Sequence, residues 1–257
     1  MNTCALGRFA ARNRGRRVRR GAQSRLSCMS RAPRTANRAV TYSNNTNAGT
    51  ATVTVTGAGN YRGIVSASDT FTIAKQKLTA ANVALSFSSK TYRGSVIKPK
   101  VTVKNAAGKV VCKKRSTSNT SVKITYAKGC KNVGKYKVTV KGTGNYTGTV
   151  TKYFKIKPKG TSVQSVAKGS KSFTVTWKKQ TTKMSTSKVT GYQIRYSTSK
   201  SMANAKIIKV KGSAAQKKTV SKLKAGKKYY VQVRTYKTVG STTLYSAWSA
   251  KKAVTTK

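Results

Sequence analysis

The chain has 257 residues, of which 55 are Lys or Arg and only one, Asp69, is acidic, so its formal net charge is +54. It contains neither His nor Glu, and it therefore lacks the residues for Ser-His-Asp catalysis, for a pair of catalytic carboxylates and for a carboxylate-lined calcium or magnesium site. These absences favour a binding or structural protein over an enzyme, and we expect no catalytic residue, cofactor or metal.

The N-terminal segment, residues 1–39, differs in composition from everything after it. Residues 1–40 contain 11 Arg and no Lys, whereas residues 41–257 contain 39 Lys and five Arg. Because the segment shows neither a strand-like nor a helix-like apolar period, we predict a disordered arm. Two interpretations stay open: an arm that neutralises the phosphates of nucleic acids, or a stretch that is not an authentic part of the protein. No signal peptide and no membrane span is visible.

After the arm, apolar and polar residues alternate in runs such as V-T-V-T at 53–56, which predicts antiparallel strands with one buried face. An internal repeat is also visible. Residues 42–73 and 126–156 share a leading Tyr, an N-x-G turn, an alternating run, the segment G-x-G-N-Y-x-G and a closing F-x-I, at an offset of 83 to 85 residues. The glycine-rich segment predicts a hairpin, with Tyr61 and Tyr146 packed against the sheet.

The two copies of the repeat differ in what precedes them. A strand-rich stretch, residues 76–121, leads into the second copy, whereas the Arg-rich arm precedes the first. We therefore predict one complete sandwich repeat at 76–158 and one truncated repeat at 40–75, whose strands lack the sheet that would cover them. This difference favours the interpretation that residues 1–39 stand in place of domain sequence.

The repeats also resemble a known module. The run V-T-Y-S-N-N-T-N-A-G-T-A-T-V-T-V-T-G-A-G-N-Y-R-G at 40–63, with its counterpart in the second copy, resembles the end of the Ig-like (MBG-type) repeats of bacterial cell-surface proteins. The resemblance covers about 40–75 and 76–157. It departs at 112–121, where C-K-K-R-S-T-S-N-T-S replaces a turn that is commonly acidic in such repeats. It implies Ig-like β-sandwiches and an extracellular, cell-surface location.

The C-terminal residues, 160–257, carry a different set of motifs. They contain F-T-V-T-W at 173–177, Y-Q-I-R-Y at 192–196, L-K-A-G-K-K-Y at 223–229 and Y-S-A-W-S at 245–249. The pattern L-x-x-G-x-x-Y is typical of a tyrosine corner, in which a Tyr hydroxyl bonds to nearby backbone. In order and spacing these motifs resemble a fibronectin type III domain. The structural core that we expect comprises Trp177, Tyr192, Ile194, Tyr196, Leu223, Gly226, Tyr229, Val231, Val233 and Trp248.

The two Trp residues of this domain invite a second interpretation, a platform on which a sugar ring stacks. We favour core packing for Trp177 and packing at the edge of the sandwich for Trp248, because both lie in strand-associated motifs of the domain.

Cys112 and Cys130 lie 18 residues apart within the complete repeat, each next to a predicted turn. A disulfide between them would suit an oxidising exterior, and a pair of thiols is the alternative; the sequence leaves both open. The remaining cysteines, Cys4 and Cys28, are too isolated for a metal site.

Taken together, the sequence predicts an all-β chain of tandem β-sandwich domains, an Ig-like repeat and a fibronectin type III domain, behind a disordered arm. Its expected function is that of a non-catalytic spacer or adhesion module of a bacterial cell-surface protein. Its lysines would attract anionic wall polymers or glycans without specificity, and host or neighbouring surface proteins are further candidate partners. The alternative is a polycationic protein that binds nucleic acid through its Arg-rich arm.

Overall fold

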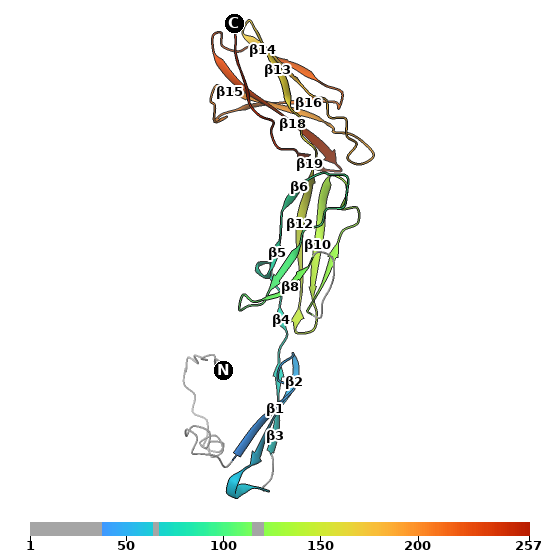
Figure 1. Cartoon of the computed structure of the whole chain (residues 1–257), viewed down its shortest axis with the longest axis vertical. Helices are drawn as coiled ribbons and strands as arrows, with labels where there is room; N and C mark the ends of the chain where they lie inside the picture. Colours follow the sequence, from blue (N-terminus) through green and yellow to red (C-terminus); the bar gives the residue numbers. More distant parts are fainter. Residues whose placement is uncertain (1–37, 64–66, 115–120) are drawn as a thin grey trace, which may run out of the picture. The chain divides into compact units, whose positions relative to one another are not determined.

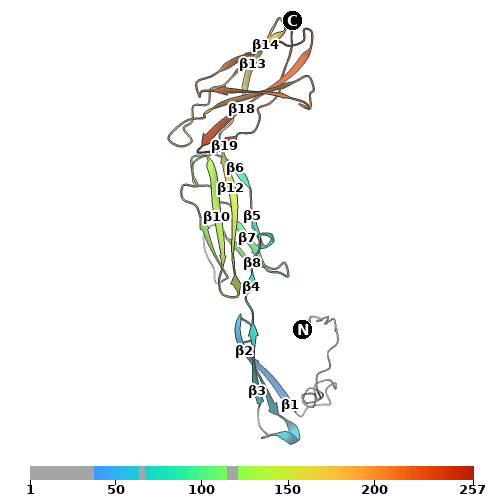
Figure 2. The same ribbon diagram turned by 180° about the vertical axis from the view of Figure 1, so that it is seen from behind.

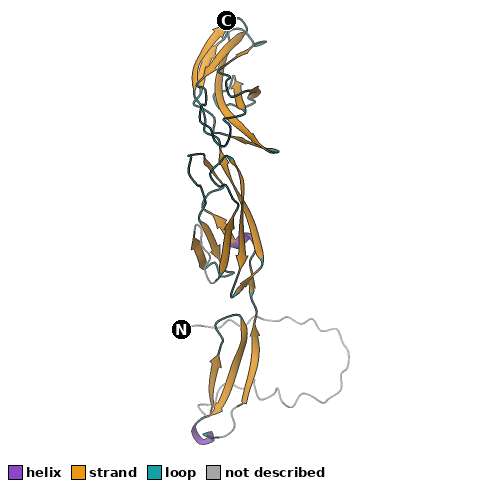
Figure 3. Ribbon diagram, turned by 90° about the vertical axis from the view of Figure 1, so that its right-hand side faces the viewer, coloured by secondary structure: helices purple, strands orange, loops and turns teal. Residues whose placement is uncertain are grey.

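The computed structural model describes residues 38–63, 67–114 and 121–257. Within these ranges almost all regular structure is β-strand (Figure 3), which confirms the all-β fold class. The predicted disordered arm lies outside the described residues except for its last two, Arg38 and Ala39. Both belong to a strand, because they pair with Gly57 and Thr56 of the next strand, so the predicted boundary at residue 39 falls two residues too late.

The first repeat forms a single three-stranded sheet (Figure 1). Its strands are β1 (Arg38–Ser43), β2 (Gly49–Gly57) and β3 (Ala67–Ile73), in the order β1-β2-β3, with the short 3-10 helix η1 (Gly59–Tyr61) after β2. Val40, Tyr42 and Phe71 are 51%, 57% and 41% exposed. These three apolar side chains of the sheet are thus about half exposed.

The second repeat forms a sandwich of two main sheets, both visible in Figure 2. One sheet has the order β6-β12-β10-β9 and the other β5-β7-β8, while β4 and β11 form a two-stranded ribbon. The elements are β4 (Gln76–Lys77), η2 (Ala80–Asn82), β5 (Val83–Leu85), β6 (Ser89–Thr91), β7 (Val101–Lys104), β8 (Val110–Lys114), β9 (Val122–Tyr126), β10 (Gly134–Gly142), β11 (Tyr146–Thr147) and β12 (Thr149–Lys157). Inward residues of both sheets, Val101, Val138 and Phe154 among them, share one buried cluster.

The C-terminal module is a second sandwich. A three-stranded sheet, β13-β14-β17, faces the sheet β16-β15-β18-β19, and β20 pairs with the first half of β18. The elements are β13 (Val163–Gly169), β14 (Ser172–Trp177), β15 (Gly191–Ser197), β16 (Lys206–Lys211), β17 (Lys217–Val220), β18 (Lys228–Val239), β19 (Thr242–Tyr245) and β20 (Lys252–Thr255). The predicted alternation in β14 gives strictly alternating half-buried and buried positions.

The glycine-rich segments behave differently in the two repeats. Tyr146 lies in β11, pairs with Gln76 of β4 and packs against the core of its sandwich. Tyr61 was predicted to pack in the same way, and this prediction is wrong, since its side chain is 51% exposed. The described part of the first repeat offers no strand equivalent to β4 beside this segment, so the Tyr61 ring lacks the cover that Tyr146 has.

Candidate functional surface

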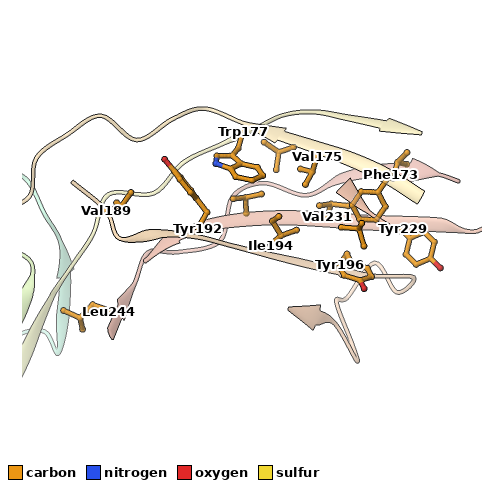
Figure 4. Close-up of a cluster of buried hydrophobic side chains, with 14 of the residues drawn as sticks. Phe173, Val175, Trp177, Val189, Tyr192, Ile194, Tyr196, Tyr229, Val231 and Leu244 are labelled. Carbon is orange, nitrogen blue, oxygen red and sulfur yellow. The ribbon is translucent and has the colours of Figure 1, made fainter. Parts of the chain in front are cut away.

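The core of the C-terminal module is built from both of its sheets (Figure 4). The predicted core residues that the structure buries are Trp177, Tyr192, Ile194, Tyr196, Tyr229, Val231 and Val233. The Trp177 and Tyr192 rings lie 5.3 Å apart, and Phe173 makes an edge-on contact with Tyr196 at 5.7 Å. Leu223 is partly buried and packs against this cluster. Such aromatic contacts stabilise the sandwich beyond their burial, so Trp177 is a packing residue and offers no sugar platform.

The turn before β18 has the geometry of a tyrosine corner. The Lys224 amide donates to the Tyr229 hydroxyl at 3.3 Å, and the Thr256 hydroxyl donates to the Lys224 carbonyl at 2.6 Å. Gly226 has φ +65, which favours glycine. The expectation that Gly226 belongs to the core is wrong, because the residue is exposed and its contribution is backbone conformation.

Trp248 lies outside the core, which corrects its place among the expected core residues. It is half-buried, and two guanidinium groups pack against its ring: the Cζ atoms of Arg195 and Arg234 lie 4.5 Å and 4.2 Å from the ring centroid. Arg234 also lies 4.2 Å from the Tyr245 ring. Guanidinium groups of the same domain already cover the Trp248 ring. Trp248 therefore anchors the segment before β20 to the outer face of the sheet.

Each of these guanidinium groups is held by a glutamine on the neighbouring strand. Arg195 donates to Gln232 Oε1 through Nε and Nη2, at 2.9 Å and 2.6 Å, and Arg234 donates to Gln193 Oε1 at 2.9 Å and 2.7 Å. Desolvation lowers the pKa of both guanidinium groups, yet arginine stays charged at neutral pH. The sequence motifs did not predict this arrangement; the one signal for it is the presence of two Arg in a segment, 160–257, whose other cations are Lys.

Cys112 and Cys130 both belong to the buried cluster of the second repeat. The structure holds them as thiols, and Cys130 Sγ donates to the Ala127 carbonyl at 3.0 Å. Burial raises the pKa of the Cys130 thiol, and the nearby charge of Lys98 lowers it to a smaller extent. The disulfide therefore remains a prediction for the oxidised protein.

The lysines that alternate along the strands point outward. Lys135, Lys137, Lys141, Lys209 and Lys211 are all exposed. Their side chains line strand faces where charge opposes edge-to-edge association of sheets.

Lys237 is the opposite case, since it is only 3% exposed. Its Nζ donates to the Ser187 carbonyl, the Ser187 hydroxyl and the Lys188 carbonyl, at 3.1, 2.7 and 2.6 Å. Burial lowers its pKa. This lysine fastens the loop before β15 to the end of β18, a structural role.

The described residues contain no group of three or more His, Cys, Asp or Glu side chains that could hold a metal ion. Among the same residues no helix has the length and apolarity that crossing a bilayer requires.

Comparison with known proteins gives one family match. Residues 156–251 match the fibronectin type III domain. No curated protein matches the chain. Solved structures that align with it include the crystal structure of the FN1–FN3 domains of chicken CNTN1, at 16% sequence identity and a TM-score of 0.35, covering 81% of this chain and 77% of that chain. With its two facing sheets, aromatic core and tyrosine corner, the C-terminal module is a fibronectin type III domain.

Proposed function

We propose that this chain is a non-catalytic modular protein, or part of one, that acts as a spacer and adhesion module at a bacterial cell surface. The observation that carries the proposal is the match of residues 156–251 to the fibronectin type III domain, preceded by a second β-sandwich. Domains of this architecture commonly occur on cell surfaces. The resemblance of residues 40–157 to Ig-like (MBG-type) repeats supports the bacterial and extracellular part of the proposal.

The second part of the proposal concerns attachment. A formal charge of +54 with a single acidic residue leaves almost no internal compensation. Exposed lysines on the strands of both sandwiches therefore attract anionic wall polymers or glycans at the surface. Such attraction between exposed groups weakens as salt screens it.

A binding titration with increasing salt tests the attachment. The full chain and a chain without residues 1–37, which keeps strand β1 intact, are each titrated with a purified polyol-phosphate wall polymer and with duplex DNA. We expect both chains to bind the wall polymer with similar affinity, because the lysines of the sandwiches carry the attraction. The proposal fails if neither chain binds the polymer at about 0.05 M salt, where electrostatic binding to polyanions is strong.

The alternative function is nucleic-acid binding by the Arg-rich arm, favoured by the 11 Arg within residues 1–40. It predicts that removing residues 1–37 abolishes binding and that DNA is preferred over the wall polymer at physiological salt. The same titration distinguishes the two functions.

A further inference from the structure

The second repeat contains a groove of about 710 Å³ beside the segment 92–100, which joins β6 to β7. Four cationic side chains line it: Lys90, Arg93, Lys98 and Lys100. None of the residues that line the groove is acidic. The groove is therefore a concentration of positive charge in a hollow, where charge acts more strongly than on a convex face.

The segment 92–100 has no regular secondary structure, yet the sandwich holds it in place. The Ile97 amide donates to the Cys130 carbonyl at 2.7 Å, and the Tyr126 hydroxyl donates to the Pro99 carbonyl at 2.6 Å. Ile97 is also buried in the core of the sandwich. Because these contacts fix the wall of the groove, a ligand would meet a preformed site.

Three of the four cations are held by neighbouring groups. Lys90 Nζ lies 5.5 Å from the centroid of the Phe87 ring, and Lys98 Nζ lies 5.3 Å from that of Tyr126. Arg93 donates through Nη2 to the carbonyl of Val96 at 3.2 Å. Side chains that are already ordered lose less conformational freedom when a ligand binds, so these cations differ from freely moving surface lysines.

The chemistry of the groove selects a class of ligand. Four cations without an acid require a ligand with several anionic groups, and the guanidinium of Arg93 suits the planar or tetrahedral oxygens of carboxylate, phosphate or sulfate. Single-stranded nucleic acid binding relies on stacking of bases on aromatic rings, and this groove offers few such rings. Phe87 is the one aromatic residue lining the groove, and Lys90 already lies over its ring while Phe154 contacts it edge-on at 6.0 Å.

We propose that this groove binds an acidic polysaccharide segment that carries phosphate, sulfate or carboxylate groups. The inference rests on the proposed function, since it names the place where an anionic surface polymer attaches. On this proposal the polymer attaches at the groove, and the other exposed lysines contribute only general electrostatic attraction.

The test compares two variants of the full chain that lose the same charge. The groove variant carries Gln at the four cations that line the groove, and the control variant carries Gln at four exposed lysines of the C-terminal module: Lys206, Lys211, Lys217 and Lys218. Binding is measured at about 0.15 M salt with three polymers, a polyol-phosphate, a sulfated dextran and a polygalacturonate, and with oligo-thymidine. We expect the groove variant to bind at least about ten-fold more weakly than the native chain, with a smaller salt dependence, and the control variant to lose less than about three-fold.

Hydrogen exchange on the native chain gives a second, independent readout. Bound polymer should slow exchange at amides of residues 86–100 and leave those of β16 and β17 unchanged. Equal losses of affinity in both variants, or no protection of amides at 86–100, would overturn the proposal that the groove is the binding site. Either result would leave general electrostatic attachment intact. If the native chain binds no polymer, the proposed function itself fails. If oligo-thymidine binds the groove more tightly than every polymer, the assigned ligand class is wrong.

Discussion

The two repeats of this chain show the same strands with and without a covering sheet. In the first repeat Val40 pairs with Val55 and Tyr42 with Val53, and in the second Ile124 pairs with Val140 and Tyr126 with Val138. At the repeat offset these are equivalent pairs, so the two sheets share one register. Local sequence, through its alternation and turns, is therefore sufficient to specify pairing.

Burial separates the two copies. Phe71 is 41% exposed, whereas its equivalent Phe154 is completely buried, and Val40 is 51% exposed against 6% for Ile124. The difference follows from the sheet β5-β7-β8, which covers the second repeat and has no counterpart in the described part of the first. Pairing is thus a local property of these repeats, while the hydrophobic stabilisation comes from the second layer.

The largest expected effect comes from truncating the equivalent phenylalanines, which tests whether the covering sheet stabilises only the second repeat. Phe154→Ala should lower the unfolding free energy of the second repeat by about 3–5 kcal/mol, because it leaves a cavity beside Phe87 and Tyr136. Phe71→Ala should cost less than about 1 kcal/mol, because its ring is already partly in water. Native-state hydrogen exchange at β10 and β2 of the full chain measures both. Comparable losses would mean that Phe71 is covered in solution.

The next largest effect concerns the cysteines, which only the complete repeat contains. An oxidant should join Cys112 to Cys130 and stabilise the second repeat by about 3 kcal/mol. Peptide mapping by mass spectrometry after alkylation in denaturant detects the bond, and Cys112→Ser serves as the control. Alkylation of both Cys112 and Cys130 in oxidised, unreduced protein would contradict the pairing.

The Cys130 thiol should react slowly in the folded, reduced chain. Burial raises the pKa of Cys130, so the reactive thiolate is scarce and alkylation should accelerate only as the pH rises above the ordinary thiol value of about 8.5. Because the folded state favours the neutral thiol, this contribution to stability is present below that pH and is lost as the pH rises through the raised value.

A smaller effect distinguishes the equivalent tyrosines. Tyr126→Phe removes the hydrogen bond to the Pro99 carbonyl and should cost about 1 kcal/mol. Tyr42→Phe should change stability by less than about 0.3 kcal/mol, because the Tyr42 side chain is 57% exposed. Thermal unfolding followed by tyrosine absorbance compares the two variants. A similar loss at Tyr42 would indicate that its hydroxyl has a partner in solution.

The sequence predicted the all-β class and, through L-x-x-G-x-x-Y and the alternating motifs, the type of the C-terminal domain. These features follow from local periodicity and turn chemistry, which a sequence shows directly. It did not predict the contacts of Trp248 with Arg195 and Arg234, because they join a loop residue to two different strands of the folded sheet. The groove at 86–100 was missed for a different reason, because its lining residues are neighbours in the sequence and only the folded loop between β6 and β7 arranges them around one hollow. Its cations look like ordinary surface lysines until the loop is placed.

The smallest expected effect concerns the single acidic residue. Asp69 lies in β3 at the position that Lys152 occupies in the second repeat, 83 residues later, and it is exposed. Its carboxylate accepts a hydrogen bond from the Thr70 amide at 2.7 Å. Asp69→Lys should therefore change the unfolding free energy of the sheet by no more than about 0.5 kcal/mol, measured by hydrogen exchange at β2 and β3.

A loss above about 1 kcal/mol would mean that Asp69 acts as an essential counter-charge. We expect the contrary, because exposed charges further apart than about 8 Å are largely screened at physiological salt. Repulsion among the lysines is then screened by solvent ions and is not balanced by an acidic partner within the protein. A chain of this charge can fold with a single acidic residue for that reason, and its electrostatic field remains available to an anionic ligand.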